Sequence, residues 1–143
     1  MRENNYANRH IVRTLKAQPD YATQLPGGIW LGIAPPRTVS PFAVFAHSAG
    51  QDAYSLNRNT LQNIAGSGLI YLIKIQDENT FDNARASNVA EWAENALLGA
   101  NGSVISGKAC YMQRISPLSL PSTEGDITTQ QEGGTYRIWV DGS

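Results

Sequence analysis

The residues that most clearly could take part in catalysis lie at 41–50, where the sequence Pro-Phe-Ala-Val-Phe is followed by Ala-His-Ser-Ala-Gly. This order is close to the Gly-x-Ser-x-Gly turn that presents a hydrolase's nucleophilic serine. In that arrangement a histidine that follows the serine in the chain takes its proton. Both histidines, His10 and His47, precede Ser48, and the residues after Gly50 lack the apolar period of a helix. We therefore predict no catalytic role for Ser48, and a strand that ends in a turn.

The histidines and the cysteine do not form a metal or redox set. His10 falls at the edge of the apolar face of a predicted helix, and His47 shares a strand face with Phe45. Both are expected to be satisfied residues at the edge of the core. The single cysteine, Cys110, excludes a disulfide framework and is expected to be a small buried side chain. We predict no metal and no cofactor.

Three acids, Asp77, Glu78 and Asp82, stand close together at the start of a predicted helix. Carboxylates there interact favourably with the positive end of the helix dipole and aid solubility. Without a histidine or metal partner they do not form a general acid–base pair. We predict no catalysis from them, and no enzyme activity for the chain.

Length and charge limit the class of protein. A chain of 143 residues is the usual size of one domain, so we predict a single domain over 1–143. The formal charge of -1 argues against a protein that grips nucleic acid, since phosphate contacts demand clustered Lys and Arg. Only 16% of the residues are charged, which favours surfaces buried against partners. No apolar run reaches the roughly 20 residues that span a membrane, and the first residues have no apolar signal core. We expect a protein made and kept in a cytoplasm-like compartment.

The patterning predicts an α+β fold, with a mainly antiparallel sheet and one long helix and a short N-terminal helix packed on one face. The expected helices are 4–18 and 80–98, the second with Thr80 as its cap and Gly99 as its stop. The expected strands are 29–34, 41–48, 69–75, 103–116 with a possible bulge at Gly107, and 135–140. The expected core residues are Trp30, Phe42, Val44, Leu69, Tyr71, Ile73, Trp92 and Ile138.

Two long polar segments, about 49–67 and 116–134, are predicted as loops. Each also carries apolar residues, and exposed apolar residues on a loop are a liability unless a partner covers them. We therefore predict that these loops form the partner interface. Its residues would be Tyr54, Leu56, Leu61 and Ile64 in the first loop, and Leu118, Leu120 and Ile127 in the second.

The ordered set of segments resembles the tail-completion, or tail terminator, proteins of long-tailed phages. The segments are Gly-Ile-Trp-Leu-Gly-Ile-Ala-Pro-Pro from Gly28, Pro-Phe-Ala-Val-Phe from Pro41, Tyr-Leu-Ile-Lys-Ile-Gln-Asp from Tyr71, the Ala-rich helix ending at Leu98, the strand with Arg114, and Gly-Gly-Thr-Tyr-Arg-Ile-Trp-Val from Gly133. The resemblance covers about residues 8–140. The connection over 49–67 is longer than the family's usual turn.

The resemblance implies a structural protein of the virion tail, assembled in the host cytoplasm. Such a subunit closes into a homo-hexameric ring on the last ring of the major tail tube protein, ends tail polymerisation, and meets the head–tail connector protein. DNA would pass through the ring without sequence-specific binding, and no membrane is involved. Another head–tail connector component, either a stopper or a minor tail protein, is the alternative. An enzyme with Ser48 as nucleophile is the third hypothesis.

Overall fold

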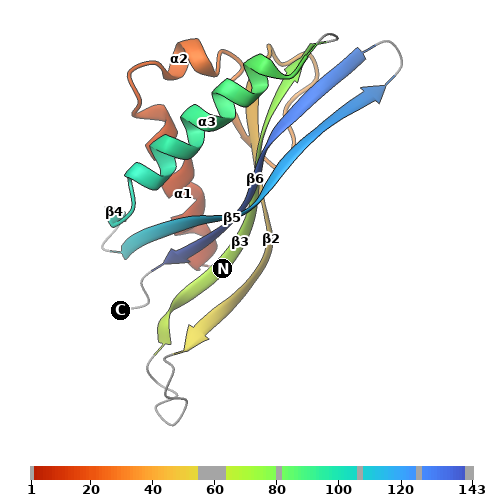
Figure 1. Cartoon of the computed structure of the whole chain (residues 1–143). Coiled ribbons are helices and arrows are strands. Elements are labelled where there is room, and N and C mark those ends of the chain that lie inside the picture. Colours follow the sequence, from red (N-terminus) through yellow and green to blue (C-terminus); the bar gives the residue numbers. More distant parts are fainter. Residues whose placement is uncertain (1, 55–63, 80–81, 106–107, 125–126, 141–143) are drawn as a thin grey trace.

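The computed structural model describes residues 2–54, 64–79, 82–105, 108–124 and 127–140 (Figure 1). Within these ranges, six strands form one sheet in the order β1-β2-β3-β6-β5-β4. The strands are β1 (Ile29–Leu31), β2 (Phe42–Tyr54), β3 (Ile64–Glu78), β4 (Ser103–Ile105), β5 (Lys108–Glu124) and β6 (Ile127–Val140). Only the β1–β2 pair is parallel, and the other four pairs are antiparallel. The predicted α+β class with a mainly antiparallel sheet is confirmed.

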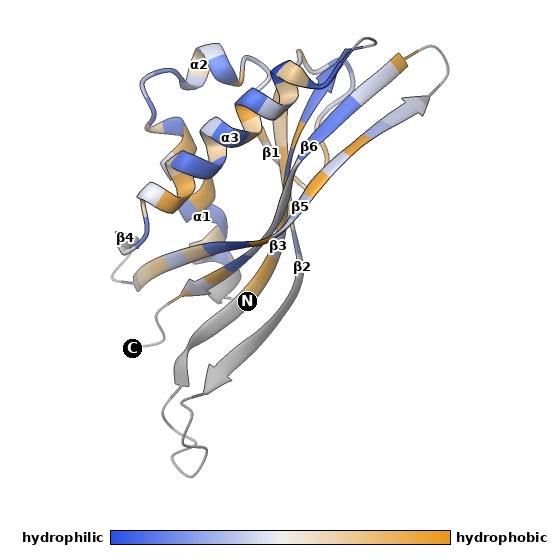
Figure 2. Cartoon of the chain, in the orientation of Figure 1, coloured by the Kyte–Doolittle hydropathy of each residue, from blue (hydrophilic) through white to orange (hydrophobic). Residues whose placement is uncertain are grey.

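The helices cover one face of this sheet (Figure 1). They are α1 (Arg2–Lys16), the single turn α2 (Tyr21–Gln24) and α3 (Ala84–Gly99). α1 buries Ala7, Ile11 and Leu15, which recur every four residues and so lie on one side of the helix. α3 buries Ala86, Val89, Ala93 and Leu97 against β3, β5 and β6. Figure 2 shows orange segments in both α1 and α3.

α3 begins later than the sequence pattern predicts. The expected cap, Thr80, lies outside the described residues, and the helix starts at Ala84. The Asp82 carboxylate accepts a hydrogen bond from the Ala84 N–H at 3.0 Å, so it satisfies one of the free donors of the first turn. The helix ends at Gly99, as predicted.

Most of the predicted core residues are buried, but two tryptophans are not. Phe42, Val44, Leu69, Tyr71, Ile73 and Ile138 are buried. Trp30 is 36% exposed, because β1 is a three-residue edge strand that nothing covers on its outer side in the described chain. Trp92 is half-buried beside the core, and its indole N–H donates to Asp20 Oδ1 at 3.0 Å.

The two predicted long loops are wrong over most of their length. Residues 49–54 continue β2 and 64–67 belong to β3, so only 55–63 remain as a connection, and these lie outside the described residues. Residues 116–124 continue β5, and β6 begins at Ile127. Both segments are therefore arms of long β-hairpins.

The loop predicted over 116–134 is wrong because β5 has no strand neighbour on its outer side here among the described residues. Pro117 and Pro121 normally indicate a loop, but an edge strand tolerates proline where the missing N–H would face outward. Gly133 and Gly134 also indicate a loop, yet here they pair with Lys74 and Pro117 in the ladders. A Cβ atom on Gly133 would lie 2.1 Å from the Ile73 carbonyl oxygen. The close approach of β6 to β3 at this position therefore requires glycine.

Candidate functional site

The two hairpins extend from opposite ends of the sheet. In Figure 1 the β2–β3 hairpin protrudes below the helices, and the β5–β6 hairpin reaches beyond them at the upper right. The register explains the first arm, because β6 follows β3 only as far as the Ser67–Val140 pair. Among the described residues, 64–66 pair with β2 alone. We use the names lower arm for 49–54 with 64–67 and upper arm for 116–124 with 127–134.

The upper arm holds three of the predicted interface residues. Leu120 is 43% exposed and Ile127 is 54% exposed, as a contact surface requires. Leu118 is half-buried. It lines a hollow of about 370 Å³ between α3 and the upper arm, so it is less available than its neighbours.

The lower arm holds the other four. Tyr54 is the last residue of β2 and pairs in register with Ile64, the first residue of β3. The structure thus brings these two together across the hairpin. Leu56 and Leu61 lie outside the described residues.

An apolar patch at the opposite edge of the sheet was missed by sequence reasoning. It consists of Trp30, Leu31, Ile33 and Val39, and we call it the β1 patch. All four are exposed, and Ile33 is the most exposed at 83%. A sequence signal was available, because Arg37 is the only charged residue between Leu25 and Gln51. Exposed apolar groups in an uncharged stretch make this patch a candidate contact surface.

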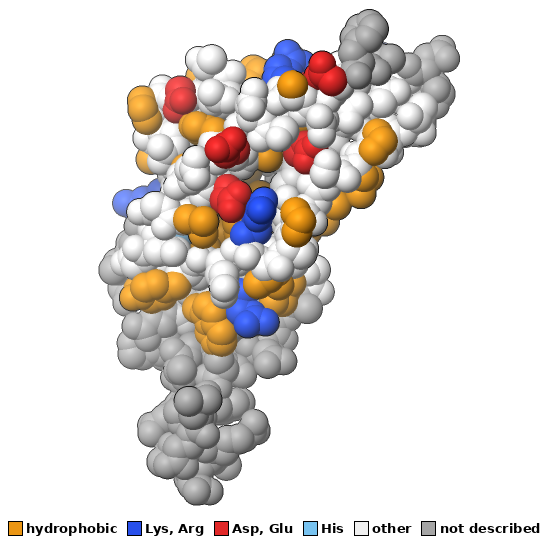
Figure 3. Space-filling model, viewed as in Figure 1, with side chains coloured by type: hydrophobic (Ala, Val, Ile, Leu, Met, Phe, Trp, Pro, Cys, Tyr) orange, Lys and Arg blue, Asp and Glu red, His pale blue; other side chains and the backbone are white. Residues whose placement is uncertain are grey.

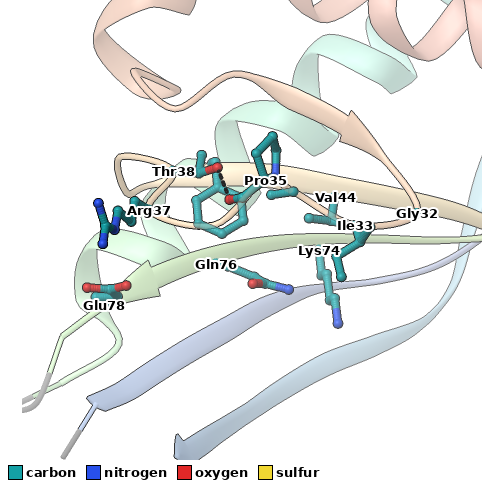
Figure 4. A pocket seen from close by; sticks show the side chains of 11 residues that line it. Gly32, Ile33, Pro35, Arg37, Thr38, Val44, Lys74, Gln76 and Glu78 are labelled. Carbon is teal, nitrogen blue, oxygen red and sulfur yellow. Dashed lines mark hydrogen bonds between the residues drawn. The ribbon is translucent and has the colours of Figure 1, made fainter.

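The chain segment between β1 and β2 crosses the face of the sheet opposite the helices and leaves a hollow of about 430 Å³ (Figure 4). Phe42 and Val44 form part of its floor, and Pro35 and Thr38 part of its wall. Arg37 and Glu78 lie at one end, and Ile33 and Lys74 at the other (Figure 4). The Lys74 ammonium already donates to Gln131 Oε1 at 2.9 Å. The hollow is therefore open and weakly polar, without a set of converging groups.

Ser48 does not stand in the turn that a nucleophile requires. It lies within β2, at a bulge between His47 and Ala49, and its hydroxyl donates to the Ile70 carbonyl oxygen at 3.1 Å. The strand continues through the predicted turn to Tyr54. The neighbouring His47 packs its ring 5.3 Å from that of Tyr71.

His10 is placed deeper than predicted. It is fully buried, and neither ring nitrogen has a hydrogen-bond partner among the residues that the structure describes. Burial lowers the pKa of this imidazole below its ordinary value, because the charged form loses its hydration. Cys110 is buried as predicted, and burial raises the pKa of its thiol to about 11. It is a thiol rather than a thiolate at neutral pH, and so a poor nucleophile.

The acids near the start of α3 have structural partners. Asp77 is fully buried and accepts two hydrogen bonds from Arg85, one of them from Nε to Oδ2 at 2.9 Å. The prediction of a solubility role is wrong for Asp77, since its carboxylate faces inward on β3 and needs this cation. These bonds raise the pKa of Arg85. Glu132, also buried, accepts from Asn83 Nδ2 and from Ser119 Oγ, and so joins α3 to the upper arm.

The visible face over α3 is acidic and partly neutralised. Figure 3 shows red side chains on this face with blue ones beside them. Glu94 and Arg114 form an ion pair at 3.3 Å in the hollow between α3 and the upper arm. Among the described residues, no three His, Cys, Asp or Glu side chains gather as a metal site. No described helix combines the length and apolar content that crossing a membrane requires.

No known protein-family profile matches the chain, and no curated protein sequence matches it either. Its fold is found among solved structures. One of these is a chain from the virion of a native gene transfer agent particle, with a TM-score of 0.65 and 14% sequence identity. The match covers 92% of this chain and 92% of that chain. At this identity the likeness shows a shared fold, and it extends over nearly all of both chains.

Proposed function

We propose that this chain is a structural protein of a phage-like virion. In the specific form of the proposal, it closes into a homo-hexameric ring on the tail tube, ends tube growth, and provides the surface that joins the tail to the head. The observation that carries the proposal is the shared fold with a chain of a gene transfer agent virion over 92% of both chains. The ordered segments that resemble tail terminator proteins support the narrower role.

A ring of identical subunits needs two different contact surfaces on each subunit, because its interfaces are heterologous. The β1 patch and two exposed apolar residues of β5 outside the upper arm, Tyr111 and Ile115, supply such a pair. They lie toward opposite edges of one sheet. Neighbours in a ring would meet through surfaces placed in this way.

The two arms suit contacts along the tail axis, with the tube protein on one side and the connector on the other. They leave the sheet at opposite ends, and the upper arm exposes Leu120 and Ile127 (Figure 1). We propose that the tube and connector surfaces lie on these arms and include Tyr54, Leu56, Leu61, Ile64 and Leu118. DNA would cross the ring without base recognition, since a formal charge of -1 does not favour tight phosphate contacts.

The test is to delete the gene from a strain that produces the particles and to measure tails by electron microscopy. The proposal expects tails of uncontrolled length without heads, and restoration by a plasmid copy. Tails of normal length that carry no heads would instead assign the chain to a connector stopper. Normal particles after deletion would overturn any structural role in the virion.

A further inference from the structure

The turn between α3 and β4 contains Asn101 followed by Gly102, which is the one Asn-Gly pair in the sequence. In this dipeptide the backbone nitrogen of the glycine can attack the side-chain amide carbon of the asparagine, because glycine has no side chain to hinder the approach. Asn101 is exposed, so water reaches it. Whether the pair reacts then depends on how firmly the fold holds the two groups.

The Asn101 side chain pairs with β5 as the backbone of a strand residue would. Its Nδ2 donates to the Met112 carbonyl oxygen at 3.2 Å, and the Met112 N–H donates to its Oδ1 at 2.7 Å. The backbone N–H of Asn101 is used at the end of α3, where it donates to the Leu98 oxygen at 3.3 Å. An amide donates and accepts at once, so it satisfies both backbone groups of Met112. The amide carbon is therefore fixed in place by two hydrogen bonds.

The attacking nitrogen is held by the same strand. The Gly102 N–H donates to the Cys110 carbonyl oxygen at 2.9 Å, next to the Ser103–Cys110 pair of the β4–β5 ladder. Attack requires this nitrogen to leave the Cys110 oxygen, lose its proton and turn toward the amide carbon of Asn101. The φ angle of Gly102 is 87°, which favours glycine at this position. Both reacting groups are thus bound to β5, and the reaction has to wait until this contact opens locally.

We infer that Asn101 is a deamidation site that its contacts with β5 keep unreactive in the closed subunit, so that its modification marks chains in which β4 has separated from β5. In the reaction a bond forms between the Gly102 nitrogen and Asn101 Cγ, and the bond from Cγ to Nδ2 breaks. Nδ2 leaves as ammonia with the proton that the Gly102 nitrogen loses. Water then opens the cyclic imide at either carbonyl carbon, which gives aspartate or isoaspartate.

The modified side chain does not restore the closed contact. An aspartate at 101 accepts from the Met112 N–H, but it has no proton to donate to the Met112 oxygen, so two oxygens face each other. The new negative charge also lies just after the C-terminus of α3, where the helix dipole disfavours it. Isoaspartate adds a carbon to the backbone and displaces the Gly102 N–H from the Cys110 oxygen. Because the ammonia is lost, the change is permanent.

The first test uses the wild-type protein alone. It is kept at pH 7.5 either folded or in enough denaturant to unfold it, and peptide mass spectrometry follows deamidation at each asparagine. Asn101 should react at least about tenfold more slowly in the folded protein, because the contact with β5 must open first. Asn95 is the internal control: it is exposed and is followed by Ala96, so it should react far more slowly than Asn101 in the unfolded chain. Equal rates at Asn101 in both states, or no preference for Asn101 in the unfolded chain, would overturn the inference.

The second test examines the product. Asn101→Asp has the same side chain as one of the two deamidated forms, and the Gly102 amide of this variant should exchange its hydrogen at least about tenfold faster than in the wild type. Asn95→Asp is the matched control, since it adds the same charge on the exposed side of α3, and it should leave the exchange of Gly102 unchanged. If Gly102 exchanges as slowly in Asn101→Asp as in the control, the amide does not hold the contact closed and the inference is wrong. If Asn101→Asp does not fold while Asn95→Asp does, the loss of the closed contact is supported, and the first test still decides the protection of Asn101.

Discussion

At the scale of single residues, His10 links the stability of the fold to pH. Its pKa in the folded state is lowered by burial, while in the unfolded chain it stays near 6.5. Below pH 6.5 the unfolded chain therefore binds the proton more readily than the folded one. This contribution to stability is complete above pH 6.5 and falls as the pH is lowered, by at most about 1.4 kcal/mol per pH unit for one proton.

His10→Leu is the variant that isolates this effect. It removes two buried nitrogens without partners, so at pH 7.5 we expect it to unfold at an equal or higher denaturant concentration. Denaturant unfolding at pH 7.5 and 5.5 should show a smaller loss of stability for the variant than for the wild type. His47 is present in both proteins and serves as the internal control. An identical loss in both would assign the pH dependence to other groups.

Gly133 is the residue at which added volume should cost most. A Cβ there would meet backbone atoms of Ile73 and Lys74, which cannot move aside as a flexible side chain would. We expect Gly133→Ala to destabilise the protein by about 1 to 3 kcal/mol, the range for overpacked sites. Gly99→Ala is the matched control, since nothing lies within 4 Å of its added methyl group and alanine favours the helix. The melting temperatures of the two variants should change in opposite directions relative to the wild type. A Gly133→Ala variant as stable as the wild type would mean that β6 does not approach β3 this closely.

At the scale of elements, the sequence was sufficient where apolar spacing alone decides the structure. The four-residue recurrence of Ala7, Ile11 and Leu15 predicted a helix, and the two-sided apolar run at 69–75 predicted a central strand. Both are present. Patterning did not extend the strands into the arms, because glycine, proline and serine indicate loops in a local reading. Whether a proline lacks its N–H on the unpaired side of a strand, or a glycine lies close to the backbone of the next strand, depends on which strand is the neighbour. Local sequence patterns do not determine that pairing.

In the candidate site too, local patterns predicted some features, and features that depend on long-range strand pairing were missed. The exposed residues Leu120 and Ile127 were found by the argument that apolar groups in a polar segment need a cover. Trp30 was assigned to the core because it belongs to the apolar face of the strand predicted at 29–34. Its exposure follows from the position of β1 at the sheet edge, and the place of a strand in a sheet is set by long-range pairing.

The prolines of β5 give a prediction about this element. If Pro117 and Pro121 protect the outer side of β5, replacing both by alanine restores two N–H groups there and leaves this side of β5 open to pairing with another strand. We expect the double variant Pro117→Ala/Pro121→Ala to form dimers or larger species at concentrations where the wild type does not. Light scattering coupled to size-exclusion chromatography measures this. Ser122→Ala, a neighbouring exposed position, should leave the mass unchanged, and an unchanged mass of the proline variant would remove the protective role.

At the scale of the whole molecule, the proposed ring limits which masses the free protein can show. Subunits with two different patches can bind one another head to tail until six copies close the ring. Alternatively, they form no stable contact until the end of the tube aligns the copies. Light scattering of the wild type should therefore give a monomer, a hexamer, or a mixture of the two. A stable dimer or trimer would count against the ring.

Substitutions in the upper arm can distinguish an effect on assembly from an effect on the stability of the fold. Leu120 and Ile127 are exposed in the free subunit, so replacing both by serine should change the melting temperature little. If the arm orders against the tube or the connector, the same change removes apolar area that the partner would bury. Particle-producing cells that carry Leu120→Ser/Ile127→Ser should then yield tails of uncontrolled length or tails without heads. Ser122→Ala on the same hairpin should yield normal particles. Normal particles from the leucine–isoleucine variant would move the partner surface away from the upper arm, and a melting temperature far below the wild-type value would show that these side chains support the fold instead.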